Sequence, residues 1–182
     1  VHVDADGVLA PNRNPVITTV TVQEGSASGA AVAELKAGQK YAFVPRIDTR
    51  LLEPYYALTV DLDGIDVDDA EALAAIEPEE LLTRFTRHQR CEIPVFSWFA
   101  NAGSFVLGTT VDERVGETVY AERGVTCPAI DGEQRTPEAI YTAPAGGDDD
   151  PLPADGVVHG WVVLRDGRGG TAVQAFDLPI SP

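Results

Sequence analysis

The chain has 182 residues, and its 13 Lys and Arg against 29 Asp and Glu give a formal net charge of −16. That charge disfavours nucleic acid and anionic membrane surfaces as partners, and it favours cations or a basic protein surface. The length suits one domain with a core of its own. No apolar run approaches the roughly 18 residues that a membrane-spanning helix needs.

Short β-strands separated by turns are predicted for the first third of the chain, after a leader at residues 1–14. Residues 16–22 are dominated by β-branched side chains, which favour a strand. Residues 41–47 alternate as a second strand, in which Pro45 requires an edge position or a bulge. Leu and Val alternate with polar residues over 58–62, which predicts a further short strand.

The pattern changes to helical spacing in an insertion at about residues 64–90. Residues 68–76 place Ala and Leu at helical intervals behind an acidic N-cap. Pro78 suits the first turn of a second helix, predicted at residues 79–89. Basic residues gather near the end of that second helix: Arg84, Arg87, His88 and Arg90.

The second half of the chain again predicts short strands with Gly-rich and Pro-rich turns between them. They are expected at residues 93–99, 105–107, 115–120, 139–141, 157–164 and 171–178. The last two flank Gly167-Arg168-Gly169-Gly170, a strong hairpin signal because Gly supplies the positive φ angles. Many short strands at steady spacing predict an all-β antiparallel sandwich. Trp98 is expected to be buried between its two sheets.

Three segments carry a resemblance to a known family: residues 96–105, 141–146 and 161–172. They comprise a strand with a Trp leading into a Gly turn, a Thr-small-Pro segment, and a strand followed by Asp-Gly-x-Gly-Gly. In this order they resemble the bacterial immunoglobulin-like (PKD-type and cadherin-like) domains of cell-surface lipoproteins, myxobacterial type. The resemblance implies one Ig-like β-sandwich domain at residues 15–182, carrying the small helical insertion.

The two cysteines, Cys91 and Cys127, lack the Cys-x-x-Cys spacing of a redox or zinc site. They are either two free thiols or one disulfide, and we favour the disulfide. On the chain-entropy model it would stabilise the fold by roughly 3–4 kcal/mol, and it would place the protein outside the cytoplasm. We therefore expect a protein of the cell surface, the periplasm or the secreted fraction. A signal peptide removed before Val1 fits this location, with lipid anchoring through the removed segment left open.

A cluster of carboxylates near the start of the insertion is the best candidate metal site. Hard oxygen ligands at short spacing suit Ca²⁺, although the pattern is not that of an EF-hand. The alternative is a solvated loop that caps a helix. We expect no cofactor other than this calcium, whose candidate ligands are Asp61, Asp63, Asp66, Asp68 and Asp69.

The sequence contains no coherent catalytic set, so we do not expect an enzyme. Its three histidines are scattered, and the Gly-Ser-Ala-Ser-Gly run at 25–29 lacks the strand and helix of a nucleophile elbow. We expect a non-catalytic exported surface or interaction module with a protein partner in the cell envelope. The alternatives are an accessory subunit of an extracytoplasmic enzyme complex, or a carbohydrate-binding module. The last needs exposed aromatics, for which the candidates are Tyr55, Tyr56 and Tyr120.

Outward positions of the sandwich strands are expected to be mostly polar, so we place function in residues 64–90 and 114–135. Three arginines of the insertion, Arg84, Arg87 and Arg90, form a basic break in an acidic chain. We expect an acidic partner or another copy of the protein to dock there. The alternative is that these arginines only satisfy the end of the helix and nearby carboxylates.

Overall fold

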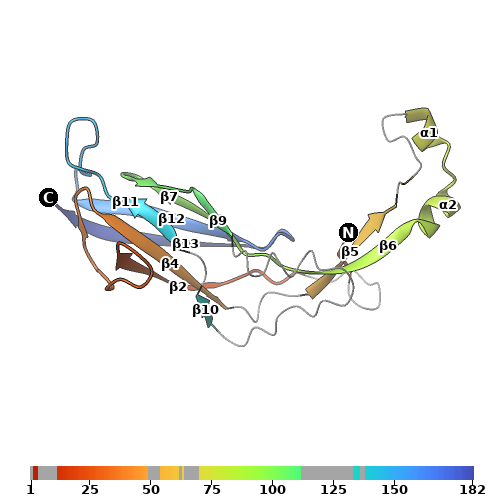
Figure 1. Cartoon of the computed structure of the whole chain (residues 1–182), viewed down its shortest axis with the longest axis horizontal. Helices are drawn as coiled ribbons and strands as arrows, with labels where there is room; N and C mark the ends of the chain where they lie inside the picture. Colours follow the sequence, from red (N-terminus) through yellow and green to blue (C-terminus); the bar gives the residue numbers. More distant parts are fainter. Residues whose placement is uncertain are drawn as a thin grey trace.

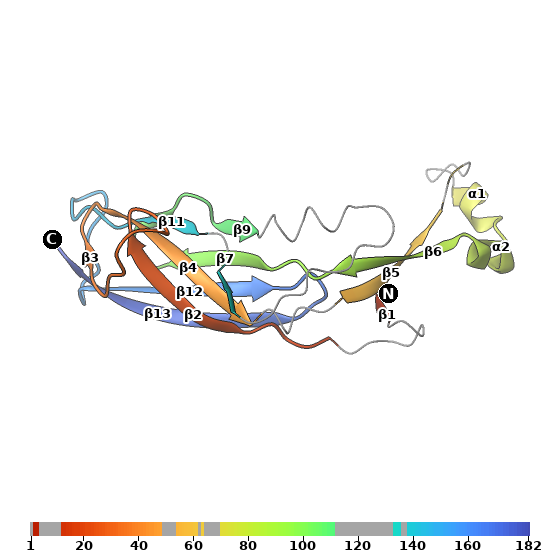
Figure 2. The same ribbon diagram turned by 60° about the horizontal axis from the view of Figure 1, so that its bottom comes forward.

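The computed structural model describes residues 2–3, 12–48, 54–61, 63, 70–111, 133–135 and 138–182. In these residues the molecule is elongated, with a β-sandwich at one end and a narrow arm at the other (Figure 1, Figure 2). The C-terminal strand belongs to the sandwich, and the first described strand, β1 (His2–Val3), belongs to the arm. No helix of the described residues is long and apolar enough to cross a membrane.

One sheet of the sandwich is antiparallel and is built around a long central strand, β4 (Lys40–Asp48). β2 (Ile17–Glu24) pairs with one edge of β4, and β11 (Ala139–Thr142) pairs with the other. β8 (Ser104–Phe105) extends the sheet beyond β11, and β10 (Glu133–Arg135) pairs with the end of β4. The strand predicted at residues 41–47 is therefore confirmed. Pro45 lies between the stretches of β4 that pair with β11 and with β10.

The other sheet has five strands in the order β3, β13, β12, β7 and β9. β12 (Val157–Arg165) and β13 (Thr171–Ser181) form a long hairpin, and β7 (Val95–Ala100) pairs with the other side of β12. β9 (Thr109–Val111) follows antiparallel to β7, whereas β3 (Leu35–Lys36) runs parallel to β13.

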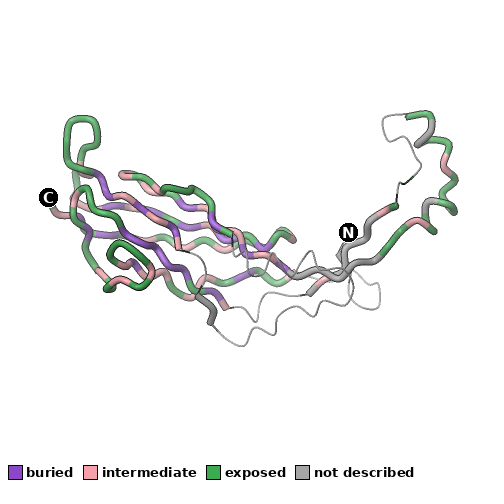
Figure 3. The backbone as a smooth tube through the Cα atoms, in the orientation of Figure 1, coloured by how far each residue is buried: buried purple, intermediate pink, exposed green. Residues whose placement is uncertain are grey.

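The order of the strands matches the immunoglobulin arrangement of two Greek-key sheets. Strands β2, β4, β11 and β8 take the places of A, B, E and D, and β13, β12 and β7 take those of G, F and C. Figure 3 shows the buried positions along the strands of the sandwich. The predicted fold, an all-β Ig-like antiparallel sandwich with a small helical insertion, is confirmed.

Phe43 of β4 lies at the centre of the core and is fully buried. Its ring centroid lies 5.4 Å from that of Phe105 and 5.3 Å from that of Tyr141, both in its own sheet. In the opposite sheet it lies 6.1 Å from Trp98 and 5.1 Å from Phe176. Edge-to-face aromatic pairs at these separations stabilise beyond the area they bury, so this ring links the two sheets.

Trp98 is 3% exposed, as the sequence predicts, and its polar atom is satisfied within the core. Its indole Nε1 donates a hydrogen bond of 3.0 Å to the hydroxyl of Thr110, which is also buried. Gly160 of β12 leaves the room that the nearby rings fill. A Cβ at Gly160 would lie 2.3 Å from the ring of Phe176, so no larger residue fits there without displacing that ring.

The prediction of a second helix running to residue 89 is wrong. The helices are short, α1 (Ala70–Ala74) and α2 (Pro78–Thr83), and they are followed by the strand β6 (Phe85–Cys91). β6 pairs along its whole length with β5 (Pro54–Val60), and β1 adds a third strand to this arm. A helix shorter than about 12 residues is marginal alone, whereas the ladder with β5 satisfies the backbone of these residues.

A buried ion pair joins the base of the arm to the β12–β13 turn. Glu92 directly follows β6, and its Oε1 accepts a hydrogen bond of 2.8 Å from Nη1 of Arg168. The two side chains are 0% and 2% exposed. The Arg168 guanidinium also lies over the ring of Tyr55 in β5, 5.1 Å from its centroid, where a cation–π attraction acts. The two long strands of the arm, β5 and β6, are thereby tied to the sandwich.

Asp166 shapes the turn that presents this arginine, and it is itself buried. Its Oδ1 accepts hydrogen bonds of 2.7 Å and 2.9 Å from the backbone N–H groups of Arg168 and Gly170. Its Oδ2 accepts one of 2.7 Å from the side chain of Asn12. Gly167 takes a φ of 82°, so the predicted Gly-rich hairpin is confirmed.

Replacing Phe43 with Ala should destabilise the fold by about 3–5 kcal/mol, because it leaves a cavity where the two sheets meet. Phe99→Ala is the matched control, since Phe99 is 43% exposed on the outer side of the sandwich. We expect it to cost about 1 kcal/mol or less. Urea unfolding measures both, and equal costs would contradict the central place of Phe43.

Glu92→Gln should destabilise the protein by about 3–5 kcal/mol, because it removes one of the two charges of a buried, hydrogen-bonded ion pair. Glu80→Gln serves as the control. Glu80 pairs with Arg84 on the surface with its side chain 54% exposed, and loss of such a pair costs about 1 kcal/mol or less. The two free energies of unfolding would be compared in urea, and a cost for Glu92→Gln no larger than the control's would refute the role of the buried pair.

Candidate functional site

The alternation of β12 decides which side chains leave the core. Its even-numbered residues face inward and are buried, while its odd-numbered residues face out to solvent. Across the ladder, Trp161 lies opposite Phe99 of β7 and Ala175 of β13. In the next row, Val163 lies opposite Ser97 and Val173. An apolar surface therefore runs across three strands on the outer side of the sandwich.

We call this surface the outer strip, and its members are Phe99, Val111, Trp161, Val163, Val173 and Ala175. Phe99 and Trp161 are each 43% exposed, and Val173 is 64% exposed. The expectation that outward positions are mostly polar is therefore wrong for this sheet. The inward positions of the same strands already fill the core, so the apolar outward side chains are not needed to form it.

The rings of Phe99 and Trp161 stack on each other, with centroids 5.6 Å apart and planes inclined by 18°. Beside them opens a hollow of about 320 Å³, whose lining includes Trp98, Phe99, Gly103, Phe105, Gly108 and Trp161. Val106 and Leu107, each 64% exposed, lie in the loop next to this hollow. Exposed apolar groups that adjoin a hollow are typical of a contact surface for another molecule.

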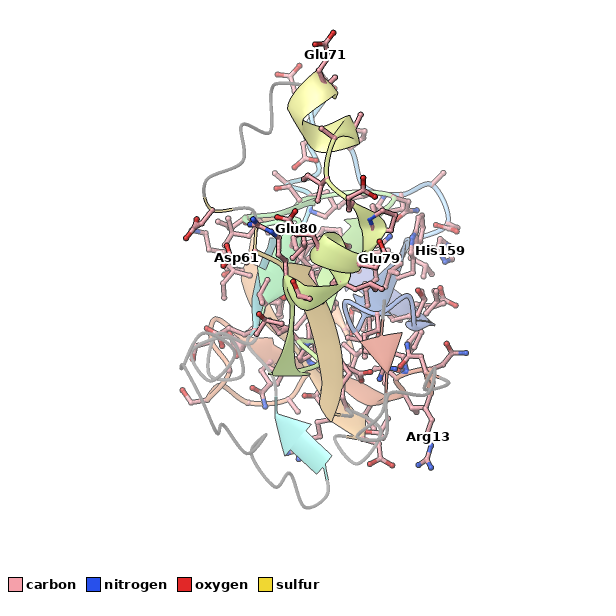
Figure 4. All side chains as sticks on the ribbon, turned by 90° about the vertical axis from the view of Figure 1, so that its right-hand side faces the viewer. Arg13, Asp61, Glu71, Glu79, Glu80 and His159 are labelled. Atoms are coloured by element: carbon pink, nitrogen blue, oxygen red, sulfur yellow. The ribbon has the colours of Figure 1, made fainter. Side chains whose placement is uncertain are left out.

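One end of the outer strip is acidic, and His159, which Figure 4 labels, lies at its centre. The ring Nδ1 of His159 lies 2.7 Å from Oδ1 of Asp177, and Nε2 lies 2.9 Å from Oδ2 of Asp155. The backbone N–H of His159 donates to Oδ1 of Asn101 at 2.9 Å. Since the two carboxylates face opposite nitrogens of one ring, these groups do not converge on a point where a metal ion could sit.

The hydrogen bonds with Asp155 and with Asp177 raise the pKa of His159, because only the protonated ring donates to both carboxylates. The hydrogen bond from His159 likewise lowers the pKa of Asp155. With the ring protonated the cluster carries a net charge of −1, and with the ring neutral it carries −2. This end of the strip is therefore negative in both states.

The opposite end of the outer strip carries a positive charge. Arg165 is the last residue of β12 and is exposed, and its Nη1 donates a hydrogen bond of 3.2 Å to the hydroxyl of Ser97. The other residues of its row are uncharged: Val95, Val111 and Thr171. The described part of the strip is thus apolar in the middle, negative at the His159 end and positive at the Arg165 end.

The structure describes two of the five candidate calcium ligands. Asp61 and Asp63 are exposed, and the backbone N–H of Asp63 donates to Oδ1 of Asp61 at 2.9 Å. The other three, Asp66, Asp68 and Asp69, lie outside the described residues. Within the described residues, no three His, Cys, Asp or Glu side chains are placed to hold a metal ion. Calcium binding by this segment stays a prediction.

The three arginines predicted to bind a partner do not share a helix end. Arg84 follows α2, and its Nη2 lies 2.9 Å from Oε1 of Glu80. Arg87 and Arg90 lie in β6, and their side chains are outside the described part of the structure. Figure 4 shows Glu80 and Asp61 on the same side of the arm, where Arg84 also donates to backbone carbonyls. Docking at these arginines stays a prediction.

The cysteine pair is likewise untested, because Cys127 lies outside the described residues and only the backbone of Cys91 is described, at the end of β6. Of the tyrosines considered for a sugar platform, Tyr55 packs under Arg168, while the Tyr56 side chain and Tyr120 are not described. The exposed aromatic pair is instead Phe99 and Trp161. Trp161 is at an odd-numbered position of β12, whereas the core residues Val158, Val162 and Leu164 are at even-numbered positions. This alternation is the sequence signal that could have predicted an exposed Trp161.

Comparisons with family models, with curated proteins and with solved structures found no match to this chain. The resemblance to PKD-type and cadherin-like lipoprotein domains therefore stays a prediction.

His159 should titrate with a pKa above the ordinary value of about 6.5. Because its folded pKa is raised, the stability that it contributes is complete below about pH 6.5 and is lost as the pH rises through the folded value. Asp177→Asn should lower the pKa, and Asp148→Asn, which removes a carboxylate with no contact to this ring, should not. NMR titration of the imidazole Cε1–H signals tests this, and a midpoint at or below 6.5 would contradict the double hydrogen bond.

Proposed function

We propose that this protein is a non-catalytic exported module of the cell surface or envelope that binds a protein partner through the outer strip. The observation that carries the proposal is the exposed stack of Phe99 on Trp161, set in an apolar strip with polar ends. Protein interfaces commonly combine an apolar, aromatic centre with a polar rim.

The stack is suited to binding because its side chains are already fixed. Phe99 and Trp161 hold each other in place, so little rotamer freedom is lost when a partner covers them. Aromatic residues of this kind dominate the binding energy of many interfaces, since a large apolar area leaves water at once. Export is proposed on other grounds, which are the predicted disulfide between Cys91 and Cys127 and the resemblance to surface domains.

A carbohydrate-binding module is the second candidate. The observation in its favour is the hollow of about 320 Å³ that opens beside the same two rings, since concave sites flanked by aromatics suit small ligands. Trp161 and Phe99 each cover one ring face of the other, which reduces the flat area offered to a sugar. The apolar strip, by contrast, continues over Val163 and Val173, where a sugar has nothing to gain.

Trp161→Ser should weaken binding to the partner by about thirtyfold or more, because loss of a central aromatic anchor costs about 2 kcal/mol or more. The control is Val16→Ser, which alters an apolar side chain that is 44% exposed just before β2 in the other sheet. Each purified variant is used to capture partners from the native envelope fraction. A protein enriched by the wild type is then tested in purified form, and the same variants are titrated with envelope polysaccharide.

Loss of protein binding in Trp161→Ser, with Val16→Ser unchanged and the melting temperatures equal, supports the interaction module. Binding of polysaccharide that Trp161→Ser abolishes would instead support the carbohydrate reading. If Trp161→Ser binds every partner as well as the wild type, the outer strip is not the contact surface and the proposal fails.

A further inference from the structure

We infer that the occupant of the outer strip is a second copy of this chain, packed face to face with its strands antiparallel. The inference rests on the proposed function, because it names the partner of the same surface. It is carried by the polarity of the strip, which is negative around His159 at one end and positive at Arg165 at the other, with apolar side chains between them.

Four successive rows of the ladder show why the strip complements itself. Along β12 they are centred on His159, Trp161, Val163 and Arg165. A half-turn about an axis that lies in the plane of the strip, across the strands and midway along β12, exchanges the first row with the fourth and the second with the third. Apolar rows then meet apolar rows, and the positive end of each copy meets the negative end of the other. Such an interface is isologous and closed.

The charges are within reach of each other in this arrangement. Facing sheets pack about 10 Å apart, a gap that an Arg side chain and an Asp side chain together can span. Arg165 of one copy would lie over the His159 row of the other, flanked by the carboxylates of Asp155 and Asp177. These carboxylates have 58% and 71% exposed side chains, so they are accessible to a second cation.

The opposite choice of axis does not give this match. A half-turn about an axis along the strands places the same end of each strip opposite its counterpart, so that Arg165 faces Arg165 and the carboxylates face carboxylates. Like charges in an interface are costly and disfavour that pairing. The polarity of the strip therefore selects the antiparallel arrangement.

The net charge of −16 opposes association of two copies, but its effect has a short range in salt. At physiological ionic strength the screening length is about 8 Å, so the contact depends mainly on the charges at the strip itself. The strip is about 20 Å long, from the His159 row to the Arg165 row at about 3.3 Å per residue, and three to four strands wide. A patch of this size suits a weak, reversible dimer.

A charge exchange tests the inference. Arg165→Glu and Asp177→Arg are prepared separately, and sedimentation velocity of the full chain is measured over a roughly hundredfold range of concentration. The wild type should show a reversible monomer–dimer equilibrium. Each variant alone should dimerise at least about tenfold more weakly. Arg165→Glu sets a carboxylate against the carboxylates of the His159 row, and Asp177→Arg removes the net negative charge of that row and sets a guanidinium against Arg165. An equimolar mixture of the two should recover dimers, since the side chains at positions 165 and 177 that face each other in the mixed dimer are then of opposite sign at both contacts.

Recovery in the mixture distinguishes this dimer from any contact elsewhere on the surface. Asp155→Arg replaces Asp177→Arg if the latter alters the melting temperature, and Trp161→Ser should abolish the dimer outright. A wild type that stays monomeric over the whole range, single variants that dimerise as the wild type does, or a mixture that stays monomeric would each overturn the inference. Suppose that the wild type is monomeric and that Trp161→Ser loses binding to an envelope protein that the wild type captures. The inference then fails and the proposed function stands.

Discussion

The sandwich depends on one ring, that of Phe43, which contacts aromatic side chains of both sheets at once. Much of the free energy that joins the two sheets comes from side chains that interdigitate between the layers. Phe43 contacts Phe105 and Tyr141 beside it and Trp98 and Phe176 opposite. Tyr141 in turn donates a hydrogen bond of 2.6 Å to the carbonyl of Ala102, which fixes the turn after β7. That turn borders the hollow at the outer strip, so the core positions the candidate site.

A different physical principle connects the arm. Its base is joined to the sandwich by the buried pair of Glu92 and Arg168, with Asp166 and Asn12 completing the hydrogen bonds of the turn. Buried charges tolerate little displacement, because each needs its partner at hydrogen-bond distance. Since Glu92 stands between β6 and β7, the same contact fixes where the arm leaves the sandwich and where the strand bearing Phe99 begins. The arm and the outer strip are thus anchored by the same residues.

The outer strip follows from the ordinary alternation of a strand applied to an unusual set of residues. β12 has Val158, Val162 and Leu164 on its inner side, as the core needs. On its outer side it has His159, Trp161 and Arg165, which gives an acidic cluster, an aromatic anchor and a cation in one line. β7 and β13 place Phe99 and Val173 beside these residues. The surface is therefore apolar in its middle, and its charge changes from negative to positive along β12. A surface whose two ends carry opposite charge can select the orientation of a partner, which an evenly apolar surface cannot.

The sequence alone determined the β-sandwich, the burial of Trp98 and the Gly-rich hairpin at residues 167–170, because these depend on local alternation and on backbone preferences. It did not determine the end of the second helix, because residues 85–91 gain more from a ladder with β5 than from their own helical pattern. Nor did it show that Phe99 and Trp161 stack, or that Asp155 and Asp177 meet at His159. Phe99 and Trp161 lie on different strands, as do His159 and Asp177, and only the register of the ladders, set when the two sheets pack, makes them neighbours. Asp155 precedes His159 by four residues, and the turn that leads into β12 brings its carboxylate to the ring.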